Sequence, residues 1–451
     1  MPLELPPLSS TAADHDWRYT AEGGANLVLS FSGTHTSPFA HHVLRLRKRK
    51  LTPTTRRADD AVPSDVDVDF GASVVAPLLG PTSVVDMRKV ELERPWLDEL
   101  VRALREGACR PRDREDEDEV DLDAPVGVLA EDLVAGDGVL AVEIKPKWGF
   151  LPARSCLSPD TADIKSHYCR TCMHRYHKSR KSGDHAGSGD DDDGFCPLDL
   201  YSGDVHRTTS AVTQLYRSWK ASNGSLNNLR VFYEGKRVSP DQFLDSHPLH
   251  DVLARHASSI DGALSPDVDL DPAASTFCTS LAHALVASPL LRTLAHFQSS
   301  LDALDIEGLA ALLLAHPATR ADLVAPADKA AAEVTKLGAQ PALAEWEAFI
   351  ARLGPALSQG RDAAAVALRE GPPRDAVLAY LLSATLKDCS LIVRVPPRDG
   401  GGAVTVKAID LDPKPIVRMA KYARLDGEIV QSWSERIERL AEGDELRRCR
   451  V

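Results

Sequence analysis

The sequence has little that would place it in a membrane or in a secreted framework. No uninterrupted apolar run of about 18 residues occurs, so we expect no transmembrane helix. Residues 1–17 have neither a basic segment nor an apolar core, and we expect no secretory signal. The chain has only eight cysteines in 451 residues, which predicts mostly free thiols in a reduced compartment.

Positive charge is also in deficit, with a formal net charge of -13. An acidic surface argues against general nucleic-acid binding. It remains compatible with a local basic pocket, because the field in a cleft depends on the charges that line it. The chain is 43% hydrophobic and 26% charged, which predicts a globular protein of two or three lobes.

The order of local patterns predicts an α+β chain without an internal repeat. Strand-like alternation and helical spacing of apolar residues divide the sequence into blocks. Strands are expected within 17–50, 126–133, 138–150, 391–395 and 403–412, a helical region broken near Pro95 within 84–106, and a mostly helical block within 246–386. The acidic stretch 113–123 is expected to be a solvated loop.

Two features near the N-terminus suit phosphate binding. Residues 22–26, EGGAN, form a glycine-rich turn, where backbone N–H groups approach phosphates without obstruction by Cβ atoms. Arg45 follows on the next expected strand, where kinase-like folds carry a cation for nucleotide phosphates. An ordinary hairpin turn and a surface arginine explain the same residues.

The segment VEIKPKWGF, residues 142–150, places Glu143, Lys145 and Lys147 in an apolar run. Either one polar face of a strand is solvated, or these side chains bind anionic groups in a cleft. Residues 227–232, NNLRVF, set two amides and a guanidinium at another strand start, which suits recognition of hydroxyl and phosphate groups.

Carboxylates stand beside both C-terminal strands. Asp388 precedes a buried strand, where it is suited to orient or deprotonate a hydroxyl. Asp410 ends an apolar strand, and its carboxylate suits Mg²⁺. Lys414, Arg418 and Tyr422 recur every four residues and would share one helix face. Structural alternatives are a polar strand end and an aspartate that caps a turn.

Residues 165–181, KSHYCRTCMHRYHKSRK, are the most basic stretch of the chain. Cys169, Cys172, His174 and His177 have spacing typical of zinc ligands. The alternative is a reduced structural pair of cysteines within a basic loop that faces phosphates.

Taken together, these segments resemble the inositol-pentakisphosphate 2-kinase family. The matching segments are EGGANLVLSF (22–31), VLRLRK (43–48), VEIKPKWGFLP (142–152), CRTCMH (169–174), CPLDLYSGD (196–204), NNLRVF (227–232), KDCSLIVRV (387–395) and IDLDPKP (409–415). The combination of EIKPK with GFLP is highly specific, and residues 53–125 and 246–386 match poorly. The resemblance implies a protein-kinase-like two-lobed fold, with an N-lobe at 1–130, a C-lobe at 131–451 and a large, mostly helical inositide-binding insertion at about 150–386.

The resemblance also implies the reaction and the role of each residue. ATP would phosphorylate the 2-hydroxyl of inositol 1,3,4,5,6-pentakisphosphate to give the hexakisphosphate, phytate. Lys145 would approach the transferring phosphate, Asp388 would activate the 2-hydroxyl and Asp410 would hold Mg²⁺. The implied nucleotide-binding residues are Gly23, Gly24, Ala25, Asn26, Arg45, Glu143 and the hinge Ala130, Glu131 and Asp132. The implied inositide-binding residues are Arg114, Lys147, Asn227, Asn228, Arg230, Lys414, Arg418 and Tyr422.

Cys172 stands where plant members of the family carry a phosphate-binding lysine. The resemblance further implies a monomer without nucleic-acid or membrane partners, located in the nucleus, the cytoplasm or both. Two alternatives are a catalytically inactive inositide-binding scaffold and a zinc-binding interaction protein built on residues 169–177. The presence of Glu143, Lys145, Asp388 and Asp410 favours the enzyme.

Overall fold

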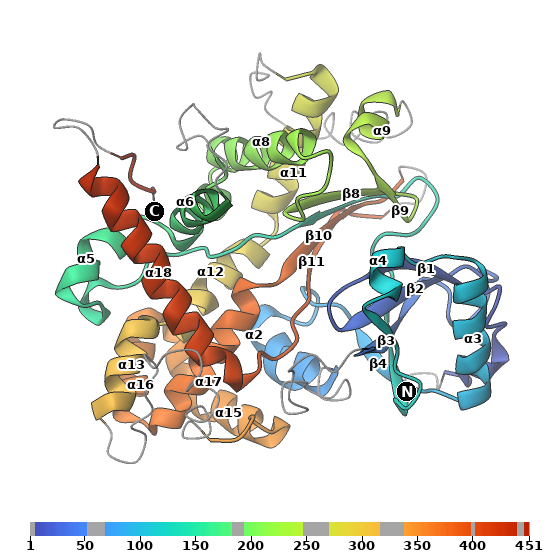
Figure 1. Cartoon of the computed structure of the whole chain (residues 1–451), viewed down its shortest axis with the longest axis horizontal. Helices are drawn as coiled ribbons and strands as arrows, with labels where there is room; N and C mark the ends of the chain where they lie inside the picture. The colour runs from blue at the N-terminus through green and yellow to red at the C-terminus, as the bar shows by residue number, and fades with distance from the viewer. Residues whose placement is uncertain are drawn as a thin grey trace. The chain divides into compact units, whose positions relative to one another are not determined.

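The computed structural model describes residues 5–51, 68–182, 194–246, 270–315, 338–397, 402–439 and 446–450. Its helices and antiparallel strands form two compact units (Figure 1). The first unit comprises Met1–Ala141, Val231–Val238 and Arg394–Ala403, and the second unit comprises the remainder. The α+β class expected from the sequence is confirmed.

An antiparallel sheet of order β1-β2-β3-β6-β4, with β5 paired to β3, organises the first unit. Its strands are β1 (Trp17–Glu22), β2 (Asn26–Phe31), β3 (His42–Lys50), β4 (Met87–Glu91), β5 (Asp118–Val120) and β6 (Val126–Glu131). The helical segments are η1 (Leu8–Ser10), η3 (Gly71–Val75), α2 (Ala76–Leu79), α3 (Arg94–Glu106) and α4 (Arg112–Glu115). Arg45 pairs with Val28 on β2 and with Val128 on β6, so it lies on a central strand.

The core of this unit forms because alternate residues of β2 and β3 point inward. Leu27, Leu29, Leu44 and Leu46 are fully buried and pack with the apolar face of α3. The helical region predicted for 84–106 is wrong in its first part, which forms β4. Pro95 lies in the first turn of α3 and does not break the helix, because a proline there removes no intrahelical hydrogen bond.

The second sheet has the order β11-β10-β7-β8-β9. Its strands are β7 (Leu140–Ile144), β8 (Leu229–Tyr233), β9 (Lys236–Val238), β10 (Ser390–Val395) and β11 (Thr405–Ile409). Every residue of β7 is buried, as is typical of a central strand. This sheet therefore brings the segments that follow β7 and precede β8 and β10 into one neighbourhood.

Helices make up most of the second unit. Their bounds are η4 (Arg154–Cys156), α5 (Pro159–Lys165), α6 (Arg170–Ser182), α7 (Pro197–Leu200), α8 (Val205–Ala221), α9 (Pro240–Asp245), α11 (Pro272–Ala287), α12 (Leu290–Leu301), α13 (Asp305–Ala315), α15 (Leu343–Gln359), α16 (Arg361–Glu370), α17 (Pro373–Lys387), η8 (Ile416–Arg418) and α18 (Met419–Glu438). The helical prediction for 246–386 is confirmed within 270–315 and 338–386, while 247–269 and 316–337 lie outside the described residues.

Aromatic side chains fill one part of the second unit's core. Tyr216 of α8 packs against Phe243 of α9 and Phe277 of α11, and Trp219 of α8 packs against Phe243, with ring centroids 5.8–5.9 Å apart. The T-shaped pairs among them, Tyr216–Phe243 and Trp219–Phe243, stabilise a core beyond the area that they bury.

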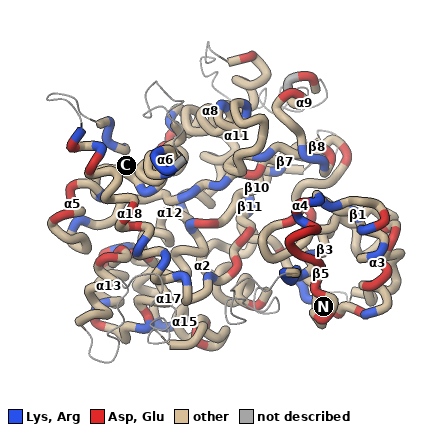
Figure 2. The backbone as a smooth tube through the Cα atoms, in the orientation of Figure 1, with Lys and Arg blue, Asp and Glu red and all other residues tan. Residues whose placement is uncertain are grey.

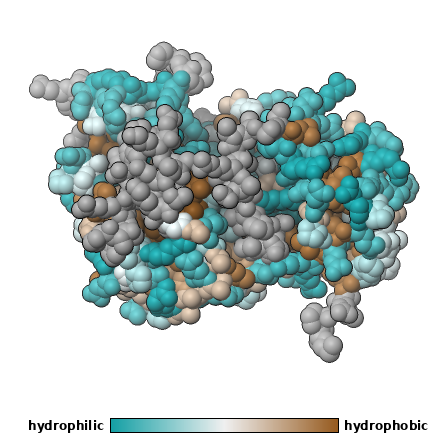
Figure 3. All heavy atoms as spheres, turned by 60° about the horizontal axis from the view of Figure 1, so that its bottom comes forward, coloured by the Kyte–Doolittle hydropathy of each residue, from teal (hydrophilic) through white to brown (hydrophobic). Residues whose placement is uncertain are grey.

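No single helix among the described residues is long and apolar enough to cross a membrane, although one bent pair, Pro272–Ala287 with Leu290–Ala315, passes on length and composition together. On the face drawn in Figure 3, hydrophilic residues predominate and the apolar ones form small groups. Figure 2 shows lysines and arginines along α6, and acidic residues along α4 and β5.

Candidate active site

The hydroxyl of Ser390 is the centre of a buried polar cluster in the second unit. Ser390, at the start of β10, is fully buried, and its Oγ donates to Glu143 Oε1 at 2.9 Å. Lys145 Nζ donates to the same Oγ at 3.2 Å, and Arg230 NH1 donates to Glu143 Oε2 at 3.1 Å. Charge-assisted hydrogen bonds of this kind hold a lysine and a carboxylate in fixed positions.

Asp410 completes this cluster from the end of β11. Its Oδ2 lies 3.4 Å from Ser390 Oγ. A hydroxyl has one proton, so the shorter contact to Glu143 takes it. Asp410 has a φ of 59°, a left-handed conformation that aspartate tolerates better than most residues, and its side chain is exposed. The chain turns here and presents a carboxylate to the same serine hydroxyl that Lys145 contacts.

Asp388 caps the C-terminal end of α17, where the charges of Lys145 and Lys147 act on its carboxylate. Lys414 Nζ donates to its Oδ2 at 2.7 Å, while 61% of the Asp388 side chain remains exposed. Partial burial acts to raise the pKa of Asp388, but the charges of Lys414, Lys145 and Lys147 outweigh it and lower the pKa. Asp388 is therefore ionised and accessible at neutral pH.

The loop after β7 is held by one buried amide. Gln298 of α12 is fully buried, donates to the backbone oxygens of Lys147 and Leu386, and accepts a hydrogen bond from Gly149 N at 2.8 Å. Gly149 is the residue that fits here, because a Cβ would lie 2.7 Å from the ring of Tyr201. Gln298 thus joins the Lys147 loop to the end of α17, which carries Asp388.

Lys147 has a φ of 63°, which again marks a tight turn. Burial first, and then the charge of Lys145, lowers the pKa of its ammonium group. His174 on α6 has a pKa of about 3, lowered by burial and by the charges of Arg170, Lys178 and Lys147. Such mutual effects require cations in one neighbourhood, and a bound anion would relieve their repulsion.

One residue of the predicted NNLRVF segment contacts this site through its backbone, and another through its side chain. Asn228 precedes β8, and its backbone oxygen accepts a hydrogen bond from Lys145 N at 3.0 Å. Asn227 lies beside it and is exposed. The side chain of Arg230 donates a hydrogen bond to Glu143. The arginine is therefore positioned by the buried cluster.

The predicted helical row of Lys414, Arg418 and Tyr422 is wrong for Lys414. Lys414 precedes η8 and lies between Pro413 and Pro415. It is not helical because a residue before proline disfavours the α-helical conformation. Arg418 ends η8, and Tyr422 lies on α18 with its ring 6.1 Å from that of Tyr380. Lys414 instead joins the site through its ion pair with Asp388.

The first unit contains the glycine-rich turn between β1 and β2. Gly23 N donates to Asn26 O at 2.9 Å, and a Cβ at Gly23 or Gly24 would meet no atom within 4 Å. Ala25 is exposed beside them. Arg45 is half-buried on β3, and the Asn26 side-chain oxygen accepts from its NH2 at 3.1 Å in the amide orientation that satisfies both groups. The turn and the arginine thus lie together.

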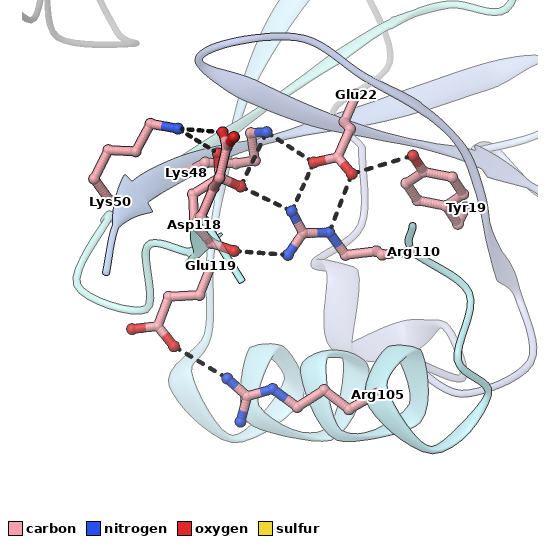
Figure 4. A network of polar contacts seen from close by, with 9 residues as sticks. Tyr19, Glu22, Lys48, Lys50, Arg105, Arg110, Asp118 and Glu119 are labelled. Atoms are coloured by element: carbon pink, nitrogen blue, oxygen red, sulfur yellow. Dashed lines mark hydrogen bonds and ion pairs between the residues drawn. The ribbon is translucent and has the colours of Figure 1, made fainter. Parts of the chain in front are cut away.

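A buried network fixes this turn (Figure 4). Glu22 and Asp118 each pair with both Lys48 and Arg110, at 2.6–3.0 Å, with side chains 1–7% exposed. Burial raises the pKa values of both carboxyl groups, but hydrogen bonds from the cations outweigh it and lower them. Asp118 therefore contradicts the expectation that 113–123 is a solvated loop, because two buried cations require buried carboxylates.

Of the three residues predicted to form a hinge, Ala130 and Glu131 end β6 and Asp132 follows it. Ala130 is buried and pairs with Val43 and Met87. Asp132 is buried, and its carboxylate accepts from the backbone N of Val134 and of Ala135. Glu131 is half-buried, and Arg114 lies half-buried on α4, where its charge acts on Tyr19.

The two cysteines predicted to bind zinc lie close together. Two further cysteines, which the sequence did not indicate as ligands, lie beside them. Cys169 and Cys172 converge with Cys196 and Cys449. His174 and His177 are outside this group, and His177 Nδ1 instead lies 2.7 Å from Ser432 Oγ.

Sequence reasoning also missed Ser390 and Gln298. Ser390 belongs to the segment KDCSLIVRV, in which the sequence assigns a chemical role to Asp388 alone. One signal could have indicated Ser390. The serine stands at a strand start, directly after an aspartate and a cysteine. Gln298 carried no signal, because a glutamine inside a helical block is ordinarily exposed.

The second unit thus contains a cluster of lysines, an accessible ionised carboxylate and a second carboxylate at a strand end. Enzymes that transfer phosphoryl groups have sites of this kind. The inositol-pentakisphosphate 2-kinase family model matches residues 19–428, and the chain belongs to that family.

Two of three curated relatives match this chain over nearly its whole length. The inositol-pentakisphosphate 2-kinase of Cryptococcus neoformans is 33% identical over 454 aligned residues, covering 96% of this chain and 97% of the relative. That of Arabidopsis thaliana is 25% identical, covering 93% and 94%. That of Danio rerio is 29% identical over 50% of this chain and 44% of its own length.

Proposed function

We propose that this protein transfers the γ-phosphate of ATP to the 2-hydroxyl of inositol 1,3,4,5,6-pentakisphosphate and releases inositol hexakisphosphate. The observation that carries the proposal is the arrangement of Lys145, Ser390, Glu143 and Asp410 at hydrogen-bond distance, near the Asp388–Lys414 pair. The family names a substrate with five phosphates, and a site for it needs several fixed cations.

Asp388 is the residue that we assign to the 2-hydroxyl. Its lowered pKa makes it a weak base, so it would accept the hydroxyl proton as a hydrogen bond and orient the oxygen for attack. This suits phosphoryl transfer, in which positioning and charge neutralisation contribute more than early proton removal. Lys414 would keep Asp388 ionised while it also faces an inositide phosphate.

Lys145 is assigned to the transferring phosphate and Lys147 to a phosphate of the inositide. Ser390 holds the ammonium group of Lys145 through a bond from a fully buried position. Lys147 has a lowered pKa in the free protein, and an anionic phosphate beside it would raise that pKa and strengthen the contact.

Asp410 is the residue that we assign to Mg²⁺. Its carboxylate is exposed at a strand end, and carboxylate oxygen together with substrate phosphates is the ligand set that Mg²⁺ prefers. Bound there, the ion would neutralise charge on the phosphates of ATP. Asp410 would also keep its contact with Ser390, which links the metal ligand to Lys145.

The first unit is assigned to the nucleotide, as part of a protein-kinase-like two-lobed arrangement. The exposed Gly23-Gly24 turn and the half-buried Arg45 support this assignment. Ala130, Glu131 and Asp132 would form the hinge. Arg114, Asn227, Asn228, Arg230, Arg418 and Tyr422 remain proposed inositide-binding residues. We further propose a monomer, located in the nucleus, the cytoplasm or both, that acts without nucleic-acid or membrane partners.

The test is a product assay on the full chain. Mg-ATP and inositol 1,3,4,5,6-pentakisphosphate are incubated with wild type, Asp388→Ala and the control Asp362→Asn, an exposed aspartate on α16. Anion-exchange chromatography follows the hexakisphosphate. We expect product from wild type and the control, and a loss of several orders of magnitude for Asp388→Ala. Tight inositide binding without product from wild type would instead support an inactive inositide-binding scaffold.

A further inference from the structure

A buried lysine directly precedes Asp388. Lys387 is the last residue of α17 and is only 4% exposed, although lysine is rarely buried to this extent. Burial lowers the pKa of its ammonium group, and the charge of Asp302 opposes that effect. A buried ion pair is often no more stabilising than apolar residues of the same volume. The burial of Lys387 therefore calls for a reason other than the stability of α17.

Three aromatic rings lie around this ammonium group. Lys387 Nζ is 4.0 Å from the ring centroid of Trp148, 4.9 Å from that of Tyr380 and 5.4 Å from that of Phe150. Aromatic rings attract a cation within about 6 Å of the centroid, tryptophan most strongly, and the attraction grows where water is excluded. The same Nζ donates to Asp302 Oδ2 at 2.5 Å. We call Lys387, Asp302 and the three rings the lysine cage.

The lysine cage joins two segments that carry proposed site residues. Trp148 and Phe150 belong to the loop after β7, directly behind Lys147, and their rings stack with centroids 6.2 Å apart. Lys387 is the residue before Asp388 at the end of α17. An ammonium group from one segment therefore contacts two rings from the other.

The C-terminal turn of α12 supports the same two segments. Gln298 donates to Lys147 O at 3.1 Å and to the carbonyl oxygen of the residue before Lys387 at 2.9 Å. Asp302, which follows α12, donates from its backbone N to Gln298 O at 3.1 Å and accepts from Lys387 with its carboxylate. Gln298 thus fixes the backbone of both segments, and Asp302 fixes the side chain next to Asp388.

The carboxylate of Asp388 depends on such support. Its side chain is 61% exposed, and Lys414 Nζ donates to it at 2.7 Å. A group that orients a reacting hydroxyl must be placed accurately, since a misplacement of about 1 Å can cost roughly 100-fold in rate. The buried residues beside Asp388 therefore determine where its carboxylate lies.

We propose that Lys387 is a positioning residue for the phosphoryl transfer, which keeps Asp388 and the Lys147 loop at a fixed separation through the lysine cage. The inference rests on the proposed function, because that function assigns Asp388 to the acceptor hydroxyl and Lys147 to an inositide phosphate. Lys387 acts through these residues, since its own ammonium group is enclosed by Asp302 and the rings.

The test replaces the charged pair and the tryptophan ring separately in the full chain. Lys387→Met combined with Asp302→Leu removes both charges together, because either change alone would leave an uncompensated buried charge. The matched control combines Arg352→Met with Asp375→Leu and removes an ion pair at the other end of α17, where Arg352 Nε donates to Asp375 Oδ2 at 2.9 Å. Trp148→Phe retains an aromatic face for the ammonium group, whereas Trp148→Leu removes it.

Kinetics with Mg-ATP and inositol 1,3,4,5,6-pentakisphosphate give the main readout. For the Lys387 and Asp302 double variant we expect kcat to fall 10- to 100-fold, with the KM for ATP within twofold of wild type. The control double variant should keep the wild-type kcat. Trp148→Leu should lower kcat at least fivefold, and Trp148→Phe should stay within twofold of wild type.

The pH profile separates positioning from a general loss of structure. The charges of Lys414, Lys145 and Lys147 lower the pKa of Asp388. A displaced carboxylate would lie further from these lysines, so its pKa would rise and the acidic limb of the kcat profile should move to higher pH in the Lys387 and Asp302 double variant. A smaller folded fraction would lower kcat at every pH and leave the limb in place.

The outcomes distinguish this inference from the proposed function. If wild type forms hexakisphosphate and the Lys387 and Asp302 double variant keeps kcat within twofold, the inference is overturned and the proposed function stands. A lower kcat with an unmoved acidic limb overturns it as well. If the double variant does not fold, the Trp148 variants decide, and equal kcat in Trp148→Phe and Trp148→Leu contradicts the inference. Absence of product from wild type would refute the proposed function and this inference with it.

Discussion

Replacing Ser390 with alanine is the sharpest probe of the buried cluster. The substitution removes one hydroxyl from a fully buried position, where it donates to Glu143 and accepts from Lys145. Hydrogen bonds to charged groups contribute about 1.5–3 kcal/mol each. Of its hydrogen-bond partners among the described residues, Glu143 would keep Arg230, and Lys145 would lose the hydroxyl that fixes its ammonium group.

The magnitude follows from these two contacts. If Lys145 loses about 1.5–3 kcal/mol of positioning in the transition state, kcat/KM for ATP should fall roughly 10- to 150-fold. Steady-state kinetics on Ser390→Ala, with hexakisphosphate measured by anion-exchange chromatography, checks the value. The Tm should fall as well, because a buried carboxylate loses a donor.

The matched control is Ser280→Ala. Ser280 on α11 is also buried, but its hydroxyl makes no hydrogen bond with the described residues. Its removal should leave kcat/KM within twofold of wild type. If Ser390→Ala also stays within twofold, the buried serine does not position Lys145 and the reasoning is refuted.

Three further substitutions test other parts of the molecule. Lys414→Ala removes the charge that most lowers the pKa of Asp388, so that pKa should rise and the acidic limb of the kcat profile should move to higher pH; an unmoved limb would exclude Asp388 as the titrating group. Gly149→Ala places a Cβ about 2.7 Å from the ring of Tyr201 and should lower stability by about 1–3 kcal/mol in urea unfolding, whereas an unchanged midpoint would show that the loop can shift. Arg110→Met leaves two buried carboxylates with one fewer cation and should cost about 3–5 kcal/mol, read from the midpoint of denaturant unfolding; a loss under 1 kcal/mol would contradict the buried ion-pair network.

Strand and helix patterns were predictable where a local signal determines the element. The alternation in β2 and β3 and the alanine- and leucine-rich helices of 270–315 and 338–386 matched their periodicities. The segment 84–91 was not predictable, because its pairing with β6 lies in tertiary contacts that no local pattern encodes. The prediction that Lys414 lies on a helix was wrong for a reason visible in the sequence, namely the prolines on both sides of it.

The sequence predicted the site residues whose charged side chains suit phosphoryl transfer. It did not predict the uncharged residues that position those side chains and loops. Lys145 and Asp388 stand in distinctive segments, whereas Ser390 and Gln298 become meaningful only when distant segments meet. The same holds for Cys449, whose partners lie far along the chain. Within the acidic run 113–123, the sequence likewise does not indicate that Asp118 is the residue buried against Lys48 and Arg110.

The most direct test of the central claim compares two pentakisphosphates that differ in the free hydroxyl. Inositol 1,3,4,5,6-pentakisphosphate offers the 2-hydroxyl, while inositol 1,2,3,4,5-pentakisphosphate offers the 6-hydroxyl. With Mg-ATP and the full chain, we predict rapid formation of hexakisphosphate from the first and at least 100-fold slower formation from the second. Equal rates, or product from the second isomer alone, would contradict the account in which Asp388 orients the 2-hydroxyl.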